Sequence, residues 1–262
     1  MSVKTELINL DKIGGKLRVV SSPYYYMIAD GAIPGHKVRR VFGYNAAVGA
    51  AFEDVCETSA TINLPASAVA MEVVSASIAD TLAGTGARRV EVHGLNSNWE
   101  ETNEVIKMNG QTPVACAKTY RRINNFHVME AGTGRSAAGI ILLRAAGAGV
   151  TYSQIGVGSN IQNQCLFTVP NNYKAYVVGW AGSAAVKDAK IQLRAKRDWD
   201  DGDLIDVFHA QDSMVLTDAG LYRPFSIPLS LPPRCDIKVS ASSTGATALV
   251  SASIDLFYES IE

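Results

Sequence analysis

Hydrophobic and polar residues alternate along much of this chain with a period of two, which marks β-strands that have one buried and one solvated face. In residues 190–196 (KIQLRAK), the apolar Ile, Leu and Ala alternate with Lys, Gln and Arg. The same alternation occurs at 89–93, 236–241 and 251–258. No segment keeps a helical period over three turns. The pattern predicts an all-β protein.

Turn-forming dipeptides lie between the predicted strands. An Asn-Gly pair at 109–110 follows the stretch 104–108 and precedes the stretch 112–116, and an Asp-Gly pair at 201–202 follows the stretch 190–196. Asn-Gly and Asp-Gly favour two-residue hairpins because both residues of such a turn need a positive φ. We therefore expect antiparallel hairpins at both places.

The predicted strands fall into two groups. Between them, residues 145–164 are rich in Gly, Ser, Asn and Gln and contain no charge. We expect two tandem antiparallel β-sandwich domains of jelly-roll-like type over 61–150 and 165–262, joined by a connector at 151–164. Residues 1–60 show little strand periodicity. They predict an extended N-terminal arm that orders against a neighbour, with a local strand pair as the alternative.

The chain is nearly neutral and has few charged residues. The 262 residues include 24 Lys and Arg against 25 Asp and Glu, a net charge of -1, which argues against specific nucleic-acid binding or attraction to an anionic membrane. Charged residues make up 19% of the chain, below the roughly 25% that is usual. Either the strands are buried on both faces or a partner covers part of the surface. We expect neither a membrane-spanning segment nor a secretory signal.

Catalytic and cofactor motifs are weak or incomplete. The four cysteines are far apart and predict buried reduced thiols, and the four histidines show no metal-ligand spacing. A G-x-G-x-x-A match at 132–137 lacks the acidic residue that a dinucleotide site needs about 20 positions later. There is no nucleophile elbow. We expect no enzyme activity and no cofactor.

An acidic cluster is the sharpest candidate for a metal site. It consists of Asp198, Asp200, Asp201 and Asp203. These carboxylates could bind Ca²⁺, but the glycine comes one position too early for an EF-hand loop and the closing Glu is missing. An exposed hairpin tip explains the cluster better.

Aromatic and basic residues supply the candidate binding groups. Tyr24, Tyr25 and Tyr26, with the pair Arg39 and Arg40, are the expected contacts with a neighbouring chain, because Tyr and Arg are enriched at interfaces.

The three tryptophans are candidates for stacking on a glycan. Trp99, Trp180 and Trp199 lie in or beside predicted turns and strand ends. Packing in the core is the commoner fate of a Trp side chain.

Several motifs together resemble a protein family. GTGAR at 84–88, GLNSNW at 94–99 and MNGQTPV at 108–114 follow one another, and LSLPPRCDIKV at 229–239 precedes VSASIDL at 250–256. They are similar to the GTGAR, GLDANW, LNGTTPV, LPEKTDIKV and VSAGFDLIL segments of structural proteins of tailed bacteriophages.

The resemblance implies a non-enzymatic β-sandwich component of the virion, assembled in the host cytoplasm. The expectation is a capsid decoration or cement protein that forms a homo-oligomer, most simply a homotrimer, and contacts the major capsid protein or other virion proteins. A tail, baseplate or head-fibre protein with a glycan- or receptor-binding β-sandwich is the alternative.

Overall fold

The structure, a computed structural model, describes residues 10–13, 16–19, 24–58, 61–196, 207–217, 220–245 and 247–261. Within these residues the chain forms antiparallel sheets and one short helix, α1 (Tyr24–Ala29). The prediction of an all-β protein is therefore confirmed. No helix of the described part is long and apolar enough to span a bilayer.

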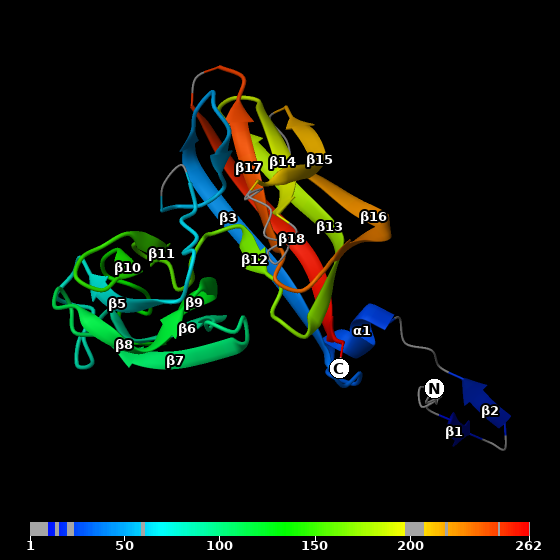
Figure 1. The fold of residues 1–262 in the computed structure, drawn as a ribbon, viewed down its shortest axis with the longest axis horizontal. Coiled ribbons are helices and arrows are strands. Elements are labelled where there is room, and N and C mark those ends of the chain that lie inside the picture. Colours follow the sequence, from blue (N-terminus) through cyan, green and yellow to red (C-terminus); the bar gives the residue numbers. More distant parts are fainter. Residues whose placement is uncertain are drawn as a thin grey trace.

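The middle of the chain forms the first sandwich (Figure 1). A four-stranded sheet in the order β11-β10-β5-β8 packs on a three-stranded sheet in the order β7-β6-β9. Alternate residues point between the sheets, where Met71, Val90, Phe126 and Leu143 are buried. The strands are β5 (Val69–Ser75), β6 (Ala87–Leu95), β7 (Glu101–Lys107), β8 (Val114–Tyr120), β9 (Arg122–Ala131), β10 (Ile141–Ala145) and β11 (Thr151–Ile155).

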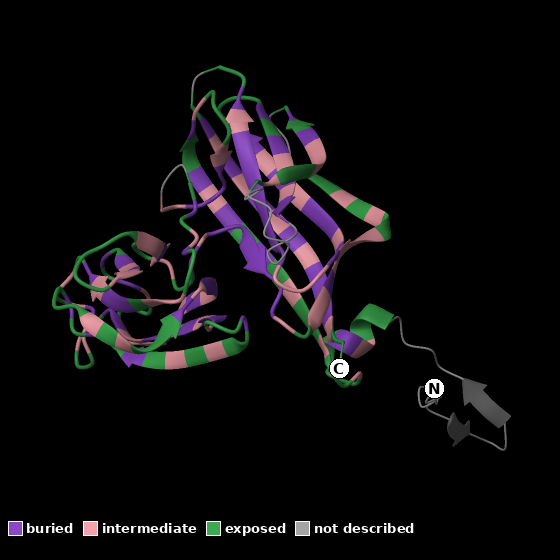
Figure 2. Cartoon of the chain, viewed as in Figure 1, coloured by how far each residue is buried: buried purple, intermediate pink, exposed green. Residues whose placement is uncertain are grey.

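The second sandwich has a larger core. Its sheets have the orders β12-β17-β14-β15, with β4 added to β17, and β16-β13-β18-β3. The alternating stretch 190–196 lies in β14, and its Ile191, Leu193 and Ala195 are fully buried, as the periodicity predicts. Buried and exposed positions alternate along most strands (Figure 2). The strands are β3 (His36–Val48), β4 (Glu53–Asp54), β12 (Leu166–Thr168), β13 (Tyr173–Ala185), β14 (Ala189–Lys196), β15 (His209–Leu216), β16 (Gly220–Leu231), β17 (Asp236–Ser243) and β18 (Ala248–Ser260).

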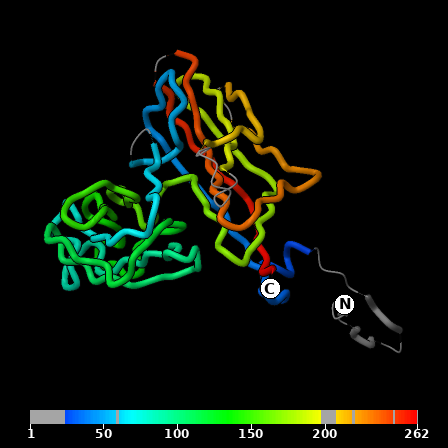
Figure 3. Tube along the Cα trace, viewed as in Figure 1, coloured from blue at the N-terminus to red at the C-terminus, as the bar shows by residue number. Residues whose placement is uncertain are grey.

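The sandwiches are nested rather than tandem. β3 pairs with β18 along nearly its whole length, and β4 pairs with β17, so both belong to the second sandwich (Figure 3). The first sandwich is inserted between β4 and β12. The expected arm over 1–60 is therefore wrong for β3 and β4. The expected connector over 151–164 is wrong for β11, which pairs with β10.

The rest of the predicted arm also has local structure. β1 (Leu10–Ile13) and β2 (Lys16–Val19) form an antiparallel pair, which is the alternative of a local strand pair. The three consecutive tyrosines begin α1. The structure therefore contains a hairpin and a helix where an extended segment was expected.

The chain turns at Asn109 and Gly110, as predicted, but the turn does not close a hairpin. Gly110 has a φ of +58°, the left-handed conformation that such a turn needs. However, β7 before it pairs with β6, while β8 after it pairs with β5 in the opposite sheet. The predicted hairpin is wrong, and the chain instead crosses the sandwich here. The second predicted hairpin, at 201–202, lies outside the described residues.

A buried ion pair joins the two sandwiches. Arg122 on β9 donates to both carboxylate oxygens of Asp236 on β17, at 2.9 and 3.1 Å, and neither side chain is exposed. Arg122 also donates to the carbonyl of Pro65 at 2.8 Å, and the Thr168 hydroxyl donates to Asp236 at 2.5 Å. The pair is therefore hydrogen-bonded away from water. It ties β9 of the first sandwich to β17 of the second.

A second buried carboxylate, that of Asp80, holds the loops at one end of the first sandwich. It accepts from the Ser75 hydroxyl and from the backbone N–H groups of Ala87, Ala138 and Gly139, at 2.5 to 2.9 Å. The second glycine of the GTGAR turn, Gly86, makes room for it. A Cβ at Gly86 would lie 2.1 Å from Oδ1 of Asp80. The motif thus encodes a loop junction.

Candidate functional site

The outer face of the sheet β16-β13-β18-β3 is one candidate binding surface. We define this outer face by Val38, Arg40, Phe42, Tyr222, Asp255 and Phe257, whose strands lie side by side in the sheet. Val38, Phe42 and Tyr222 are 48, 47 and 52% exposed. A solvated sheet face usually carries polar side chains. This face instead presents large apolar groups to the surroundings.

Helix α1 packs against one end of the outer face. The rings of Tyr24 and Tyr25 each lie 5.7 Å from the ring of Phe257 on β18. Tyr176 on β13 stacks on the same ring at 5.0 Å and 18°. Tyr26, the third predicted contact, is 67% exposed. Tyr24 and Tyr25 therefore extend an aromatic cluster on the surface, and Tyr26 is an exposed side chain of the same helix.

The predicted arginine pair is divided between two places. Consecutive residues of a strand point to opposite faces. Arg40 lies on the outer face and makes a bidentate ion pair with Asp255 at 2.5 and 2.9 Å, which raises the pKa of the guanidinium. Arg39 points the other way and donates to the carbonyl of Asn124 in the first sandwich at 3.4 Å. Only Arg40 shares the outer face with the tyrosines.

Two shallow grooves cross the outer face. One has a floor of small residues from β13 and β18 between Phe42 and Tyr222. The other lies beside α1, between Tyr25, Val38 and Phe257. Aromatic walls around small residues suit the insertion of apolar side chains from a partner.

The tryptophans do not form a sugar-binding surface in the described residues. Trp180 is fully buried in the second core, and its indole N–H donates to Asp212 at 3.0 Å. Trp99 is 4% exposed and packs 4.2 Å from the guanidinium of Arg121. A buried ring cannot stack on a glycan, so this role is wrong for both. The third tryptophan and the acidic cluster lie outside the described residues; these are Trp199, Asp198, Asp200, Asp201 and Asp203.

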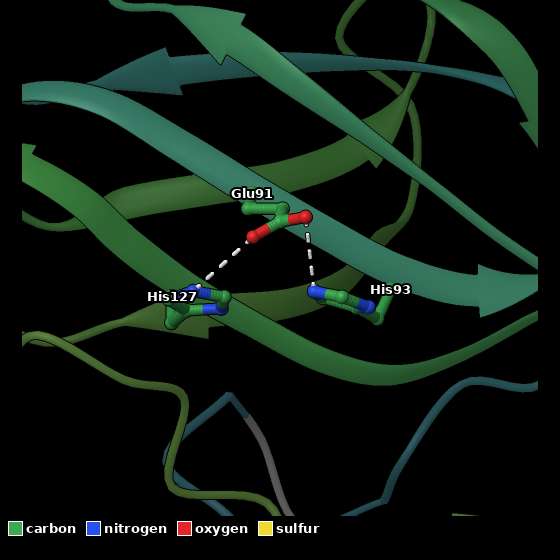
Figure 4. A group of neighbouring side chains, drawn as sticks. All are labelled: Glu91, His93 and His127. Carbon is green, nitrogen blue, oxygen red and sulfur yellow. Dashed lines mark ion pairs between the residues drawn. The ribbon is translucent and has the colours of Figure 1, made fainter.

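A cluster of two histidines and a glutamate lies on the first sandwich (Figure 4). Glu91 and His93 are two residues apart on β6, and His127 is opposite Glu91 on β9. Nε2 of His93 lies 3.1 Å from one carboxylate oxygen of Glu91, and Nε2 of His127 lies 3.5 Å from the other. The imidazole rings stack with centroids 5.7 Å apart. We call these three residues the histidine cluster.

Neighbouring amides orient the histidine cluster. The side-chain amide of Asn103 on β7 donates to Glu91 at 2.8 Å, and this bond is the main cause of the lowered pKa of that carboxyl. The Asn125 amide lies 3.1 Å from Nδ1 of His127. Burial lowers the pKa of His127. The cluster therefore combines an ionised carboxylate with an imidazole that favours its neutral form.

Spacing along the chain does not reveal the histidine cluster. The two histidines are 34 positions apart, and the local signal is a Glu-x-His triplet whose outer residues share a strand face. His127 joins them only through the register of β6 and β9.

Comparison with known proteins adds no family assignment. No protein-family model, curated protein or solved structure matches this chain.

Proposed function

We propose that this chain is a bacteriophage virion structural protein that decorates the capsid and acts by binding other subunits. The observation that carries the proposal is the exposed apolar outer face of the second sandwich. The resemblance of the motifs at 84–114 and 229–256 to phage structural proteins supports the same proposed function. The role is mechanical: subunits that bridge their neighbours add buried area across each joint and so stabilise the shell.

The composition of the outer face suits a subunit interface. Aromatic residues and Arg are enriched at interface cores because they bury a large area at a small cost in conformational entropy. Tyr25, Phe42 and Tyr222 supply the aromatic area, and Arg40 with Asp255 supplies a polar element. We propose that the occupant of this face is a second copy of the chain, within a closed symmetric homotrimer.

The oligomeric state tests this interface directly. Replacing both Phe42 and Tyr222 by Ser is expected to weaken self-association at least about 10-fold, because each change removes a large apolar contact. Sedimentation equilibrium should then give the mass of one chain where the unsubstituted protein gives three. Val215→Ser is the matched control, since Val215 is 60% exposed on β15 in the other sheet.

Two results would contradict the interface proposal. One is an unsubstituted chain that remains a monomer at micromolar concentration. The other is a protein with Ser at both positions that keeps the mass of three chains.

Position in the particle is tested separately. Cryo-EM of virions, with the outer-face variant as a comparison, is expected to show the chain on the capsid and its occupancy reduced by the variant. Density at the tail, baseplate or a fibre would replace the capsid role by the alternative role in a host-contacting structure.

A further inference from the structure

We propose that Glu91, His93 and His127 form a binding site for a divalent transition-metal ion of the zinc class. The site lies on β6 and β9 of the first sandwich, whereas the outer face proposed for subunit binding belongs to the second. Two imidazoles and one carboxylate favour Zn²⁺, Co²⁺, Ni²⁺ or Cu²⁺ over Ca²⁺ and Mg²⁺, which prefer oxygen ligands.

The spacing of the donor atoms fits such an ion. Bonds of about 2.0–2.1 Å in a tetrahedral site place neighbouring ligand atoms about 3.3 Å apart. Nε2 of His93 lies 3.1 Å from Oε1 of Glu91 and Nε2 of His127 lies 3.5 Å from Oε2, so the two imidazoles approach different oxygens of one carboxylate. One donor atom from each of the three residues lies within 4.8 Å of the others. Small side-chain rotations would bring all three donors to one ion.

The strands hold the donors in place before any ion binds. Glu91 and His93 share the face of β6 opposite the buried Val90 and Val92. β6 is the middle strand of its sheet, hydrogen-bonded to β7 on one side and to β9 on the other. Because the backbone is fixed on both sides, binding costs little ordering entropy.

The surrounding amides match the needs of metal-bound ligands. A ligating His uses one ring nitrogen for the metal and donates its other N–H to a neighbour. Nε2 of His127 faces Glu91, while Nδ1 faces the side-chain amide of Asn125. The amide nitrogen of Asn125 faces Nδ1 in the structure, so the amide must turn by 180° for its oxygen to accept that N–H. Asn103 holds the Glu91 carboxylate from the other side.

The cluster is open to solvent. The side chains of His93, His127 and Glu91 are 44, 27 and 16% exposed. An ion bound by three protein ligands would therefore keep a position for water or for a donor from another molecule, as zinc sites with three protein ligands do. Without a metal, the same contacts form an ion pair when the histidines are protonated, so binding must be measured directly.

Isothermal titration calorimetry of the full chain with ZnCl₂ tests the site. We expect one ion per chain. Each of Glu91→Gln, His93→Gln and His127→Gln should weaken binding at least about 100-fold, more than the 10- to 100-fold typical of an outer-shell change. With Co²⁺ as the probe, the visible absorption of a four-coordinate site should appear and be lost in the same variants.

The other histidines provide a matched control. His36 pairs with Glu259, and His209 begins β15 at the surface. The double variant His36→Gln, His209→Gln should bind zinc as the unsubstituted chain does. The positive charge of Arg39 acts on His127 and would repel a bound cation. Arg39→Gln should therefore tighten zinc binding.

Three outcomes would overturn the site. They are no binding at 100 micromolar zinc, binding that survives in His93→Gln and His127→Gln, and loss of binding in the His36, His209 control. Far-ultraviolet circular dichroism of each variant separates lost binding from lost folding, because the replaced side chains all lie on a solvated face.

Discussion

Replacing Arg122 by Met is expected to lower the free energy of unfolding by about 3–5 kcal/mol. The substitution removes the bidentate partner of Asp236 and leaves a fully buried carboxylate. Lys196 is a positively charged residue that interacts with Asp236: burial lowers the pKa of Lys196 to about 8, and the Asp236 carboxylate acts against that shift. Lys196 can compensate only in part, because it does not replace the two aligned N–H groups of a guanidinium.

Urea unfolding of the Arg122→Met protein measures this cost. Arg89→Met is the control: Arg89 pairs with Glu130 at 3.0 Å, but the two side chains are 42 and 39% exposed, so the expected loss is below about 1 kcal/mol. The double variant Arg122→Met, Asp236→Leu should recover much of the stability, since no charge is then buried alone. Equal losses for Arg122→Met and Arg89→Met would contradict the assigned role of the buried pair.

Replacing Asp80 by Ala is expected to cost at least about 3 kcal/mol, because an unsatisfied buried polar group costs about 1–3 kcal/mol. Three backbone N–H groups lose their acceptor, those of Ala87, Ala138 and Gly139. Ala87 lies about 50 positions before Ala138 and Gly139 in the sequence. Loss of the shared acceptor would therefore release both loops from the junction at once.

Thermal unfolding and hydrogen exchange measure the effect of Asp80→Ala. Exchange at the amides of Ala87 and Gly139 should accelerate more than exchange in β14, which is in the other sandwich. Asp188→Ala is the control, because Asp188 is exposed and its substitution should change stability by no more than about 0.5 kcal/mol. Unchanged protection at the loop amides would show that another group holds this junction.

The strands with a strong contrast between their faces could be predicted from the sequence. In β14, Ile191, Leu193 and Ala195 alternate with charged and amide side chains, and their burial follows. β3 could not be predicted in this way. Its inward positions include Gly43 and Asn45, neither of which is a large apolar residue. Gly43 is required because a Cβ there would lie 2.2 Å from the carbonyl oxygen of Val55. Close backbone packing thus removed the hydrophobic signal.

The candidate sites were predictable to different degrees. Tyr24, Tyr25 and Arg40 were selected by residue type, and they lie together near Phe257 on the outer face. Trp180 shows the weakness of that criterion, because an indole fits a core as well as a binding site. The histidine cluster depends on pairing between strands, which a single sequence specifies only after the sheet order is known.

The nesting of the sandwiches has a consequence for synthesis on the ribosome. Arg40 and Asp255 are 215 positions apart in sequence, yet β3 and β18 are neighbours, so the sheet that contains them closes only after the last strand emerges. All strands of the first sandwich emerge earlier and pair with one another. Once folded, that sandwich holds the end of β4 near the start of β12 and shortens the effective loop to be closed. Translation order thus favours the inserted unit as a scaffold for the unit that surrounds it.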